Sequence, residues 1–115
     1  MSSKLLNDLL ARIKLKEVEI SKQIMQYLKL FGYAYRINTV GIYDQAKHVY
    51  RSTHSSRGIP DIYFMSKKFG VIWFEVKSTK GKLNYHQKVF KTLCFDCEVQ
   101  HHVVRSLDDV MEIVK

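Results

Sequence analysis

The chain has 115 residues and a mass of 13.6 kDa, which suits one domain, residues 1–115, rather than two. A hydrophobic fraction of 46% is enough to bury a core, so disordered, collagen-like and low-complexity classes are excluded. Nineteen Lys and Arg residues stand against eleven Asp and Glu residues. The resulting charge of +8 favours a polyanionic partner over a generically soluble basic protein.

No apolar run approaches the ~20 residues of a membrane span, and charges interrupt the N-terminus where a signal peptide needs an apolar core. Two cysteines do not make a disulfide framework. We therefore expect a cytoplasmic, intracellular protein with no membrane partner.

Two helices are predicted in the first third of the chain. Residues 1–15 form a helical extension, with Ser3 as its cap and a leucine-rich stripe along one face. A second helix over residues 17–31 ends at Gly32. The apolar stripe of the extension consists of Leu5, Leu6, Leu9, Leu10 and Ile13, and the apolar face of the second helix consists of Ile20, Ile24, Leu28 and Phe31.

Strands then alternate with helices along the rest of the chain. Strand patterns cover residues 33–40, 48–51, 60–65, 71–77 and 98–104, and helices are predicted over residues 84–95 and 107–114, the last with Ser106 as its cap. The strand over 71–77 is apolar on both faces, so it is expected at the centre of the sheet. This order predicts a mixed α/β domain with helices on the faces of a central sheet.

Two carboxylates lie at matching positions on neighbouring strands. If Met65 pairs with Val71 across a hairpin loop of residues 66–70, Asp61 lies opposite Glu75. Directly opposed residues have Cβ atoms ~4.5–5.5 Å apart, so the two negative charges repel each other. A divalent cation neutralises such a pair, and hard carboxylate oxygens suit Mg²⁺ or Mn²⁺.

A lysine shares this face of the sheet. Lys77 follows Glu75 by two positions, and Trp73 continues the same face as an apolar floor. The alternative to a metal site is a buried Asp–Lys–Glu salt-bridge cluster. Such a cluster contributes little net stability and leaves one negative charge uncompensated, so the residue types favour the metal site.

The motif resembles a known nuclease signature. GIPDIYF followed by FEVKS is similar to the PD-(D/E)XK signature, as Pro60-Asp61 and then Glu75-Val76-Lys77. GKLNYHQKVF resembles the next helix of the virus-type replication-repair nuclease (VRR-NUC) family, with Gln87 at the glutamine position. EVEISKQIMQYLKLFG and HHVVRSLDDV resemble the first helix and the closing strand and helix of that family, so the likeness covers about residues 17–110.

The resemblance implies a restriction-endonuclease-like fold, a mixed central β-sheet flanked by helices, and hydrolysis of phosphodiester bonds with Mg²⁺ or Mn²⁺ as cofactor. It implies that Asp61, Glu75 and the backbone carbonyl of Val76 bind the metal. Lys77 would orient or activate the attacking water and offset phosphate charge. Gln87 would hold the water, the lysine or the substrate backbone.

The family also carries an acid on its first helix, which here is Glu17 or Glu19. Helical spacing favours Glu17, because it shares a face with Ile20 and Ile24 toward the sheet, whereas Glu19 shares a face with exposed glutamines. We expect Glu17 to be a metal ligand or a water-bridged ligand. The alternative is an ordinary first-turn acid that complements the helix dipole.

Basic residues gather in segments without acids. Residues 45–59 and 76–91 contain no Asp or Glu, and we expect them to follow a phosphate backbone, although each cation is equally compatible with a solvated surface charge. Tyrosines interleave with these residues and either stack on bases or pack within strands. The predicted DNA contacts are Arg36, Arg51, Arg57, Lys80 and Lys82, and the interleaved tyrosines are Tyr35, Tyr43, Tyr50 and Tyr85.

Cys94 and Cys97 form a lone CxxC followed by two histidines. A zinc site is one interpretation, but a buried helix position for Cys94 and the start of a strand for Cys97 are favoured.

The sequence therefore predicts a DNA nuclease that acts on branched or flapped DNA in replication, recombination or repair. The alternatives are a four-way (Holliday) junction resolvase that works as a dimer, and a non-catalytic nucleic-acid-binding module. Intact Asp61, Glu75 and Lys77 argue against the latter. The apolar stripe of the extension favours a homodimer over folding back on its own sheet. A virus-encoded protein acting in the host cytoplasm fits the same expectation.

Overall fold

The computed structural model describes residues 3–5, 16–37, 42–44, 49–51 and 58–115. Its helices are α2 (Glu17–Leu28), α3 (Tyr85–Asp96) and α4 (Leu107–Met111). Its strands are β1 (Tyr33–Arg36), β2 (Ile42–Asp44), β3 (Val49–Arg51), β4 (Ile62–Ser66), β5 (Gly70–Val76) and β6 (Gln100–Val104). No helix in these ranges has the length and apolar character needed to cross a membrane.

The main sheet has the strand order β1-β4-β5-β6. The pairs β1–β4 and β4–β5 are antiparallel, whereas β6 runs parallel to β5, so α3 serves as the crossover between β5 and β6. Met65 pairs with Val71 as predicted, and β5 lies inside the sheet as predicted. Ser66 pairs with Gly70 as well, so the connecting turn is shorter than expected and spans residues 67–69.

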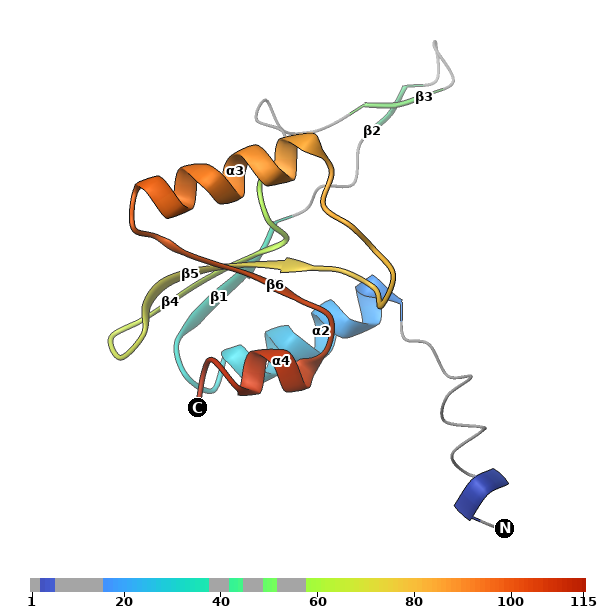
Figure 1. The fold of residues 1–115 in the computed structure, drawn as a ribbon, viewed down its shortest axis with the longest axis vertical. Coiled ribbons are helices and arrows are strands. Elements are labelled where there is room, and N and C mark those ends of the chain that lie inside the picture. The colour runs from blue at the N-terminus through green and yellow to red at the C-terminus, as the bar shows by residue number, and fades with distance from the viewer. Residues whose placement is uncertain (1–2, 6–15, 38–41, 45–48, 52–57) are drawn as a thin grey trace.

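Helices cover both faces of this sheet (Figure 1). The core lies between the sheet and the α2 and α4 layer, where alternate residues of β4 and β5 meet the apolar face of α2. The most buried members from α2 are Ile24 and Leu28, and those from the two strands are Ile62, Phe64, Ile72 and Phe74. The predicted mixed α/β architecture is confirmed at this level.

α2 ends three residues earlier than predicted. The helix stops at Leu28, and Phe31 is 37% exposed instead of joining the apolar face. Gly32 does not adopt the left-handed backbone of a helix-ending glycine. A Cβ at this position would lie 2.5 Å from the Met65 carbonyl oxygen, so the glycine lets the start of β1 approach the end of β4.

Other boundaries also differ from the prediction. β1 ends at Arg36, and residues 38–40 of the predicted strand lie outside the described residues. The sequence pattern missed β2, which pairs with β3 in a separate two-stranded sheet. Cys97 does not start a strand: it caps the end of α3 and is exposed, and β6 begins later, at Gln100. α4 ends at Met111.

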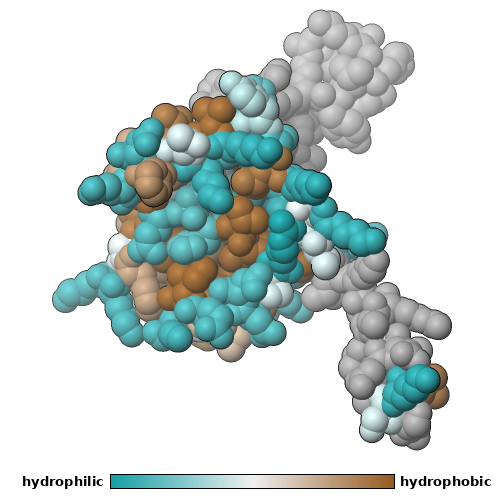
Figure 2. Space-filling model, in the orientation of Figure 1, coloured by the Kyte–Doolittle hydropathy of each residue, from teal (hydrophilic) through white to brown (hydrophobic). Residues whose placement is uncertain are grey.

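The predicted extension lies mostly outside the described residues. Residues 3–5 are helical and Leu5 is exposed, while residues 6–15 are not described. On the face of the molecule turned to the viewer, Figure 2 shows apolar side chains gathered over β6, between α3 and α4. Among the described strands, β6 is at the edge of the main sheet.

Candidate active site

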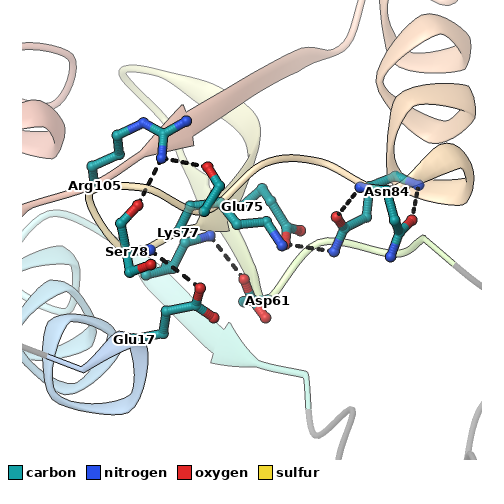
Figure 3. Close-up of polar contacts among 10 residues, drawn as sticks. Glu17, Asp61, Glu75, Lys77, Ser78, Asn84 and Arg105 are labelled. Atoms are coloured by element: carbon teal, nitrogen blue, oxygen red, sulfur yellow. Dashed lines mark hydrogen bonds and ion pairs between the residues drawn. The ribbon is translucent and has the colours of Figure 1, made fainter.

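The two predicted carboxylates meet where β4 begins and β5 ends (Figure 3). Ile62 pairs with Phe74, and continuing this register places Asp61 opposite Glu75. One carboxylate oxygen of Asp61, Oδ2, accepts a hydrogen bond of 2.8 Å from the backbone N–H of Val76. The Asp61 carbonyl accepts another of 2.7 Å from Ile37, which ties this turn to the end of β1. The pair is therefore fixed by the sheet itself.

Glu75 is 2% exposed, and its two oxygens have different surroundings. Oε1 accepts a hydrogen bond of 2.9 Å from Gln87 Nε2 and lies 3.6 Å from the Lys77 ammonium. Oε2 is also buried, but no donor among the described residues reaches it. A buried carboxylate oxygen without a donor is costly unless a proton or a cation satisfies it.

Burial favours the protonated form of both carboxyl groups, and the charge of Asp61 adds to this effect at Glu75. Burial, followed by the nearby charge of Asp61, raises the pKa of Glu75 to about 8, although the Lys77 ammonium opposes this shift. Burial also raises the pKa of Asp61, against the lowering effect of the Val76 N–H. Both shifts favour the protonated form in the metal-free molecule, most strongly at Glu75.

Gln87 is locked in place by the start of α3. Asn84 precedes this helix, and its side chain accepts a hydrogen bond of 2.9 Å from the Gln87 N–H. In return, Gln87 Oε1 accepts a bond of 2.9 Å from the Asn84 N–H, which completes a capping box. The remaining amide group, Nε2, points to Glu75. The Asn-x-x-Gln spacing is a capping signal, so the cap could have been found in the sequence.

Glu17 lies close to this site and Glu19 does not contribute to it. Glu17 Oε1 accepts a hydrogen bond of 3.2 Å from the Ser78 N–H, directly after Lys77, and its charge contributes to the raised pKa of Asp61. Glu19 instead caps α2 by accepting a bond of 3.4 Å from the Lys16 N–H. Glu17 is exposed, in contrast to the expected packing against the sheet. Its role as a ligand stays a prediction.

Sequence reasoning did not single out Arg105, which holds the segment after Lys77. One guanidinium nitrogen, Nη1, donates hydrogen bonds of 2.7 Å to the carbonyls of Ser78 and Gly81. The Arg105 N–H donates to Asp109 in α4, which secures the arginine backbone (2.8 Å). Figure 3 shows the arginine on one side of this turn and Glu17 on the other. Arg105 is thus a positioning residue for the turn that carries Lys77 toward Glu75.

The predicted DNA contacts are only partly described. Arg36 is exposed at the end of β1, and Lys80 and Lys82 are exposed on the segment between β5 and α3. Arg51 lies in β3, and Arg57 falls outside the described residues, as does most of the acid-free segment 45–59. The exposed lysines thus share a segment with Lys77.

Within the ranges that the structure covers, no three His, Cys, Asp or Glu side chains gather closely enough to hold a metal ion. Asp61 and Glu75 therefore supply two carboxylates, and Glu17 does not complete a cluster of three. Cys94 is buried in α3, as the favoured interpretation of the CxxC expected.

The comparisons with known proteins give no family for this chain. It matches no family model, no curated protein and no solved structure.

Gly58 lets the segment before Asp61 lie against the start of α3. Its φ is +83°, and a Cβ there would overlap the His86 carbonyl and lie 2.9 Å from the Gln87 nitrogen. We expect Gly58→Ala to lower the free energy of unfolding by about 3 kcal/mol or more, because backbone strain and overlap act together. Gly70→Ala is the matched control: φ is +71° there, but nothing lies within 4 Å, so strain alone should cost about 1–2 kcal/mol. Urea unfolding measures both, and equal costs would contradict this account.

Proposed function

We propose that this chain is a metal-dependent DNA nuclease of the PD-(D/E)XK type, with a restriction-endonuclease-like core related to the VRR-NUC family. One observation carries the proposal. Glu75 is buried opposite Asp61 with one oxygen lacking a donor in the described part of the chain, and Lys77 lies 3.6 Å from its other oxygen. A structural salt bridge does not need this spare acidic oxygen.

The residues present fit a hard divalent cation such as Mg²⁺ or Mn²⁺. Asp61 and Glu75 would hold it together with the backbone carbonyl of Val76, and Glu17 would contribute through a bridging water. When bound, the cation polarises the phosphoryl oxygen and lowers the pKa of a water. The unsatisfied Glu75 Oε2 and the raised pKa values of both carboxyl groups are the observations behind this assignment.

The protein side chains have separate tasks. Lys77, whose side chain is 14% exposed, orients a water for attack on the phosphorus and offsets the negative charge of the phosphate. Gln87 fixes Glu75 through its Nε2 group and keeps that carboxylate aligned with Asp61. Arg105 positions the turn after Lys77. These groups then act from fixed positions.

The substrate class follows from charge and from the family resemblance. The net charge of +8 and the exposed cations near the site suit a polyanion. We propose branched or flapped DNA in replication, recombination or repair, within the cytoplasm, with Arg36, Arg51, Arg57, Lys80 and Lys82 as phosphate contacts.

Labelled linear, flapped and four-way-junction DNA incubated with Mg²⁺, Mn²⁺ or EDTA tests this function. Cleavage that requires the metal and prefers a branched substrate supports it. Paired symmetric cuts in the junction would instead assign the resolvase activity of a homodimer. Binding without cleavage under every metal condition would overturn the nuclease and leave a nucleic-acid-binding module.

DNA binding should weaken steeply with salt. In EDTA, the logarithm of the affinity for duplex DNA should fall linearly with the logarithm of the salt concentration. The reason is that lysines and arginines that contact phosphates displace counterions from the DNA. Lys80→Ala and Lys82→Ala should each reduce the slope by about one. Lys22→Ala on α2, which is also exposed, is the control and should leave the slope unchanged. Affinity that does not respond to salt would separate these lysines from DNA binding.

The stability of the metal-free protein should decrease with rising pH in a way that depends on Glu75. Its pKa is about 8 in the folded chain against 4.5 for an ordinary glutamate, so the folded state binds more protons between these values. Stability therefore falls as pH rises from about 4.5 to about 8. Thermal melting in EDTA at several pH values measures this effect.

Glu75→Gln removes the titrating group and its interaction with Asp61, so the comparison with the wild type measures the contribution of the carboxyl pair. Burial lowers the pKa of His101 and His102, which acts in the opposite direction below pH 6.5, and both histidines stay in the variant. The wild-type melting temperature should fall relative to the variant over this range. Identical pH profiles for the two proteins would contradict the raised pKa.

A further inference from the structure

On the sheet face that carries Asp61 and Glu75, the described helix α3 covers only the part formed by β5 and β6. α3 packs over β6, and Phe90 of α3 contacts the Trp73 ring of β5 with 5.4 Å between ring centroids. α2 packs against β1, β4 and β5 from the opposite face of the sheet. Among the described elements, none packs on the α3 side of β1 and β4. This part of the sheet is therefore open beside the candidate active site.

The open part is aromatic. Tyr33 and Tyr35 of β1 are 54% and 55% exposed, and Met65 of β4 is 45% exposed. Tyr63 is half-buried, and its ring meets Trp73 edge-on with 5.0 Å between centroids. These four residues, Tyr33, Tyr35, Tyr63 and Met65, form what we term the tyrosine platform. So much exposed aromatic surface in one place is typical of a binding face.

The register places the platform beside the carboxylates. Tyr35 pairs with Tyr63, and Tyr63 pairs with Trp73, so these rings form one row across the sheet. Asp61 and Glu75 each lie two positions along their strands from this row. Side chains two positions apart share a face and are about 6.6 Å apart along the strand. A ligand on the platform therefore extends directly to the candidate metal site.

The surroundings of the platform attract an anion. No Asp or Glu occurs in residues 29–43 or 62–74, which include β1, β4 and the turn after β4. Lys67 is exposed in the turn next to Met65. Arg36 is exposed at the end of β1, although it pairs with Ile62 and so starts from the opposite face of the strand. Exposed tyrosines with cations nearby are the combination by which proteins hold single-stranded nucleic acid: the rings stack on bases and the cations contact phosphates.

We propose that the tyrosine platform binds unpaired bases of a single-stranded segment and leads that strand to Asp61 and Glu75. This inference rests on the proposed nuclease function and narrows its substrate to nucleic acid with a single-stranded arm or end. Stacking requires a free base face, which a paired base inside a duplex does not offer. The platform therefore distinguishes a flap from a continuous duplex.

Fluorescence anisotropy with the full chain in EDTA tests the platform without any cleavage. The probes are a labelled oligothymidine of about 12 nucleotides and a blunt duplex of equal length. Tyr33→Ala and Tyr35→Ala should each weaken binding of the single strand about 10-fold and leave duplex binding unchanged. Tyr35→Phe keeps the ring and should stay within about 2-fold of the wild type. Phe95→Ala on α3, where the ring is 83% exposed, is the matched control and should change neither affinity.

Two results would overturn the tyrosine platform. Tyr33→Ala and Tyr35→Ala proteins that bind the single strand as tightly as the Phe95→Ala protein overturn the platform. A wild-type dimer in sedimentation velocity that Tyr35→Ala dissociates also overturns it, because a second copy then covers this face. Should the alanine variant lower the melting temperature, Tyr35→Leu repeats the test with an apolar side chain that lacks a ring.

Cleavage of flapped DNA with Mg²⁺ is measured separately. If Tyr33→Ala and Tyr35→Ala weaken single-strand binding but the wild type does not cleave, the platform is supported and the nuclease function is rejected. If the two variants bind the single strand normally and the wild type cleaves, the nuclease function is supported and the platform is rejected.

Discussion

Asp61→Asn and Glu75→Gln are each expected to lower metal-dependent DNA cleavage by at least about 1,000-fold, which corresponds to about 4 kcal/mol of activation free energy. Both substitutions keep the size of the side chain and remove the negative charge that a divalent cation requires. DNA binding in EDTA should stay intact, and it should become tighter above about pH 8, where the wild-type Glu75 is ionised and repels the phosphates. Initial cleavage rates and anisotropy measure the two effects.

Two acidic residues far from the site provide matched controls. Asp108→Asn and Glu112→Gln change exposed side chains in and directly after α4, and both should cleave at the wild-type rate. Thermal melting should show Glu75→Gln to be at least as stable as the wild type at pH 8 in EDTA, so lost activity is not lost folding. Wild-type cleavage by either Asp61→Asn or Glu75→Gln would remove the basis of the assignment.

Lys77→Met should reduce kcat by about 100-fold to 1,000-fold, with a smaller effect on metal affinity. The methionine fills a similar volume but carries no charge, so it neither orients a water nor offsets the phosphate. The Lys77 ammonium also opposes the raised pKa of Glu75. The comparison is therefore made at pH 9, where Glu75 is ionised in the wild type, using Mn²⁺ binding and single-turnover cleavage.

Lys22→Met, which neutralises an exposed lysine of α2, is the control for a lost positive charge. Its kcat should equal that of the wild type. A Lys77→Met protein that loses metal affinity and kcat in equal proportion would indicate that the lysine serves only to organise the carboxylates.

The centre of the site could be predicted from the sequence because it depends on one hairpin. The Met65–Val71 register follows from a short turn and from strand periodicity, and it alone brings Asp61 opposite Glu75. The position of Gln87 depends on the start of α3, which the Asn-x-x-Gln cap marks. Local patterns of this kind need no knowledge of the rest of the fold.

Other features depend on contacts between distant segments. Arg105 reaches carbonyl groups more than twenty positions earlier in the chain, and backbone carbonyls carry no sequence signal. Gly32 lies against the Met65 carbonyl soon after α2 ends at Leu28, and the helical pattern that continued to Phe31 does not report this contact between distant segments. The tyrosine platform depends on which half of the sheet α3 leaves open. Sequence periodicity cannot predict this, because it indicates which residues share a face of the sheet but not which helix packs on that face.

The parallel pairing of β6 with β5 gives the order in which a newly made chain matures. Asp61, Glu75 and Lys77 all leave the ribosome before residues 100–105, yet the Lys77 N–H donates to the Val104 carbonyl (3.0 Å) and Arg105 holds the following turn. Pairing that must wait for a crossover helix forms late. Until β6 forms, β5 is therefore an edge strand, and the surroundings of Asp61 and Glu75 are incomplete. We expect a chain that ends before β6 to lack the proposed nuclease activity, because the contacts that hold Lys77 and the turn after it are then missing.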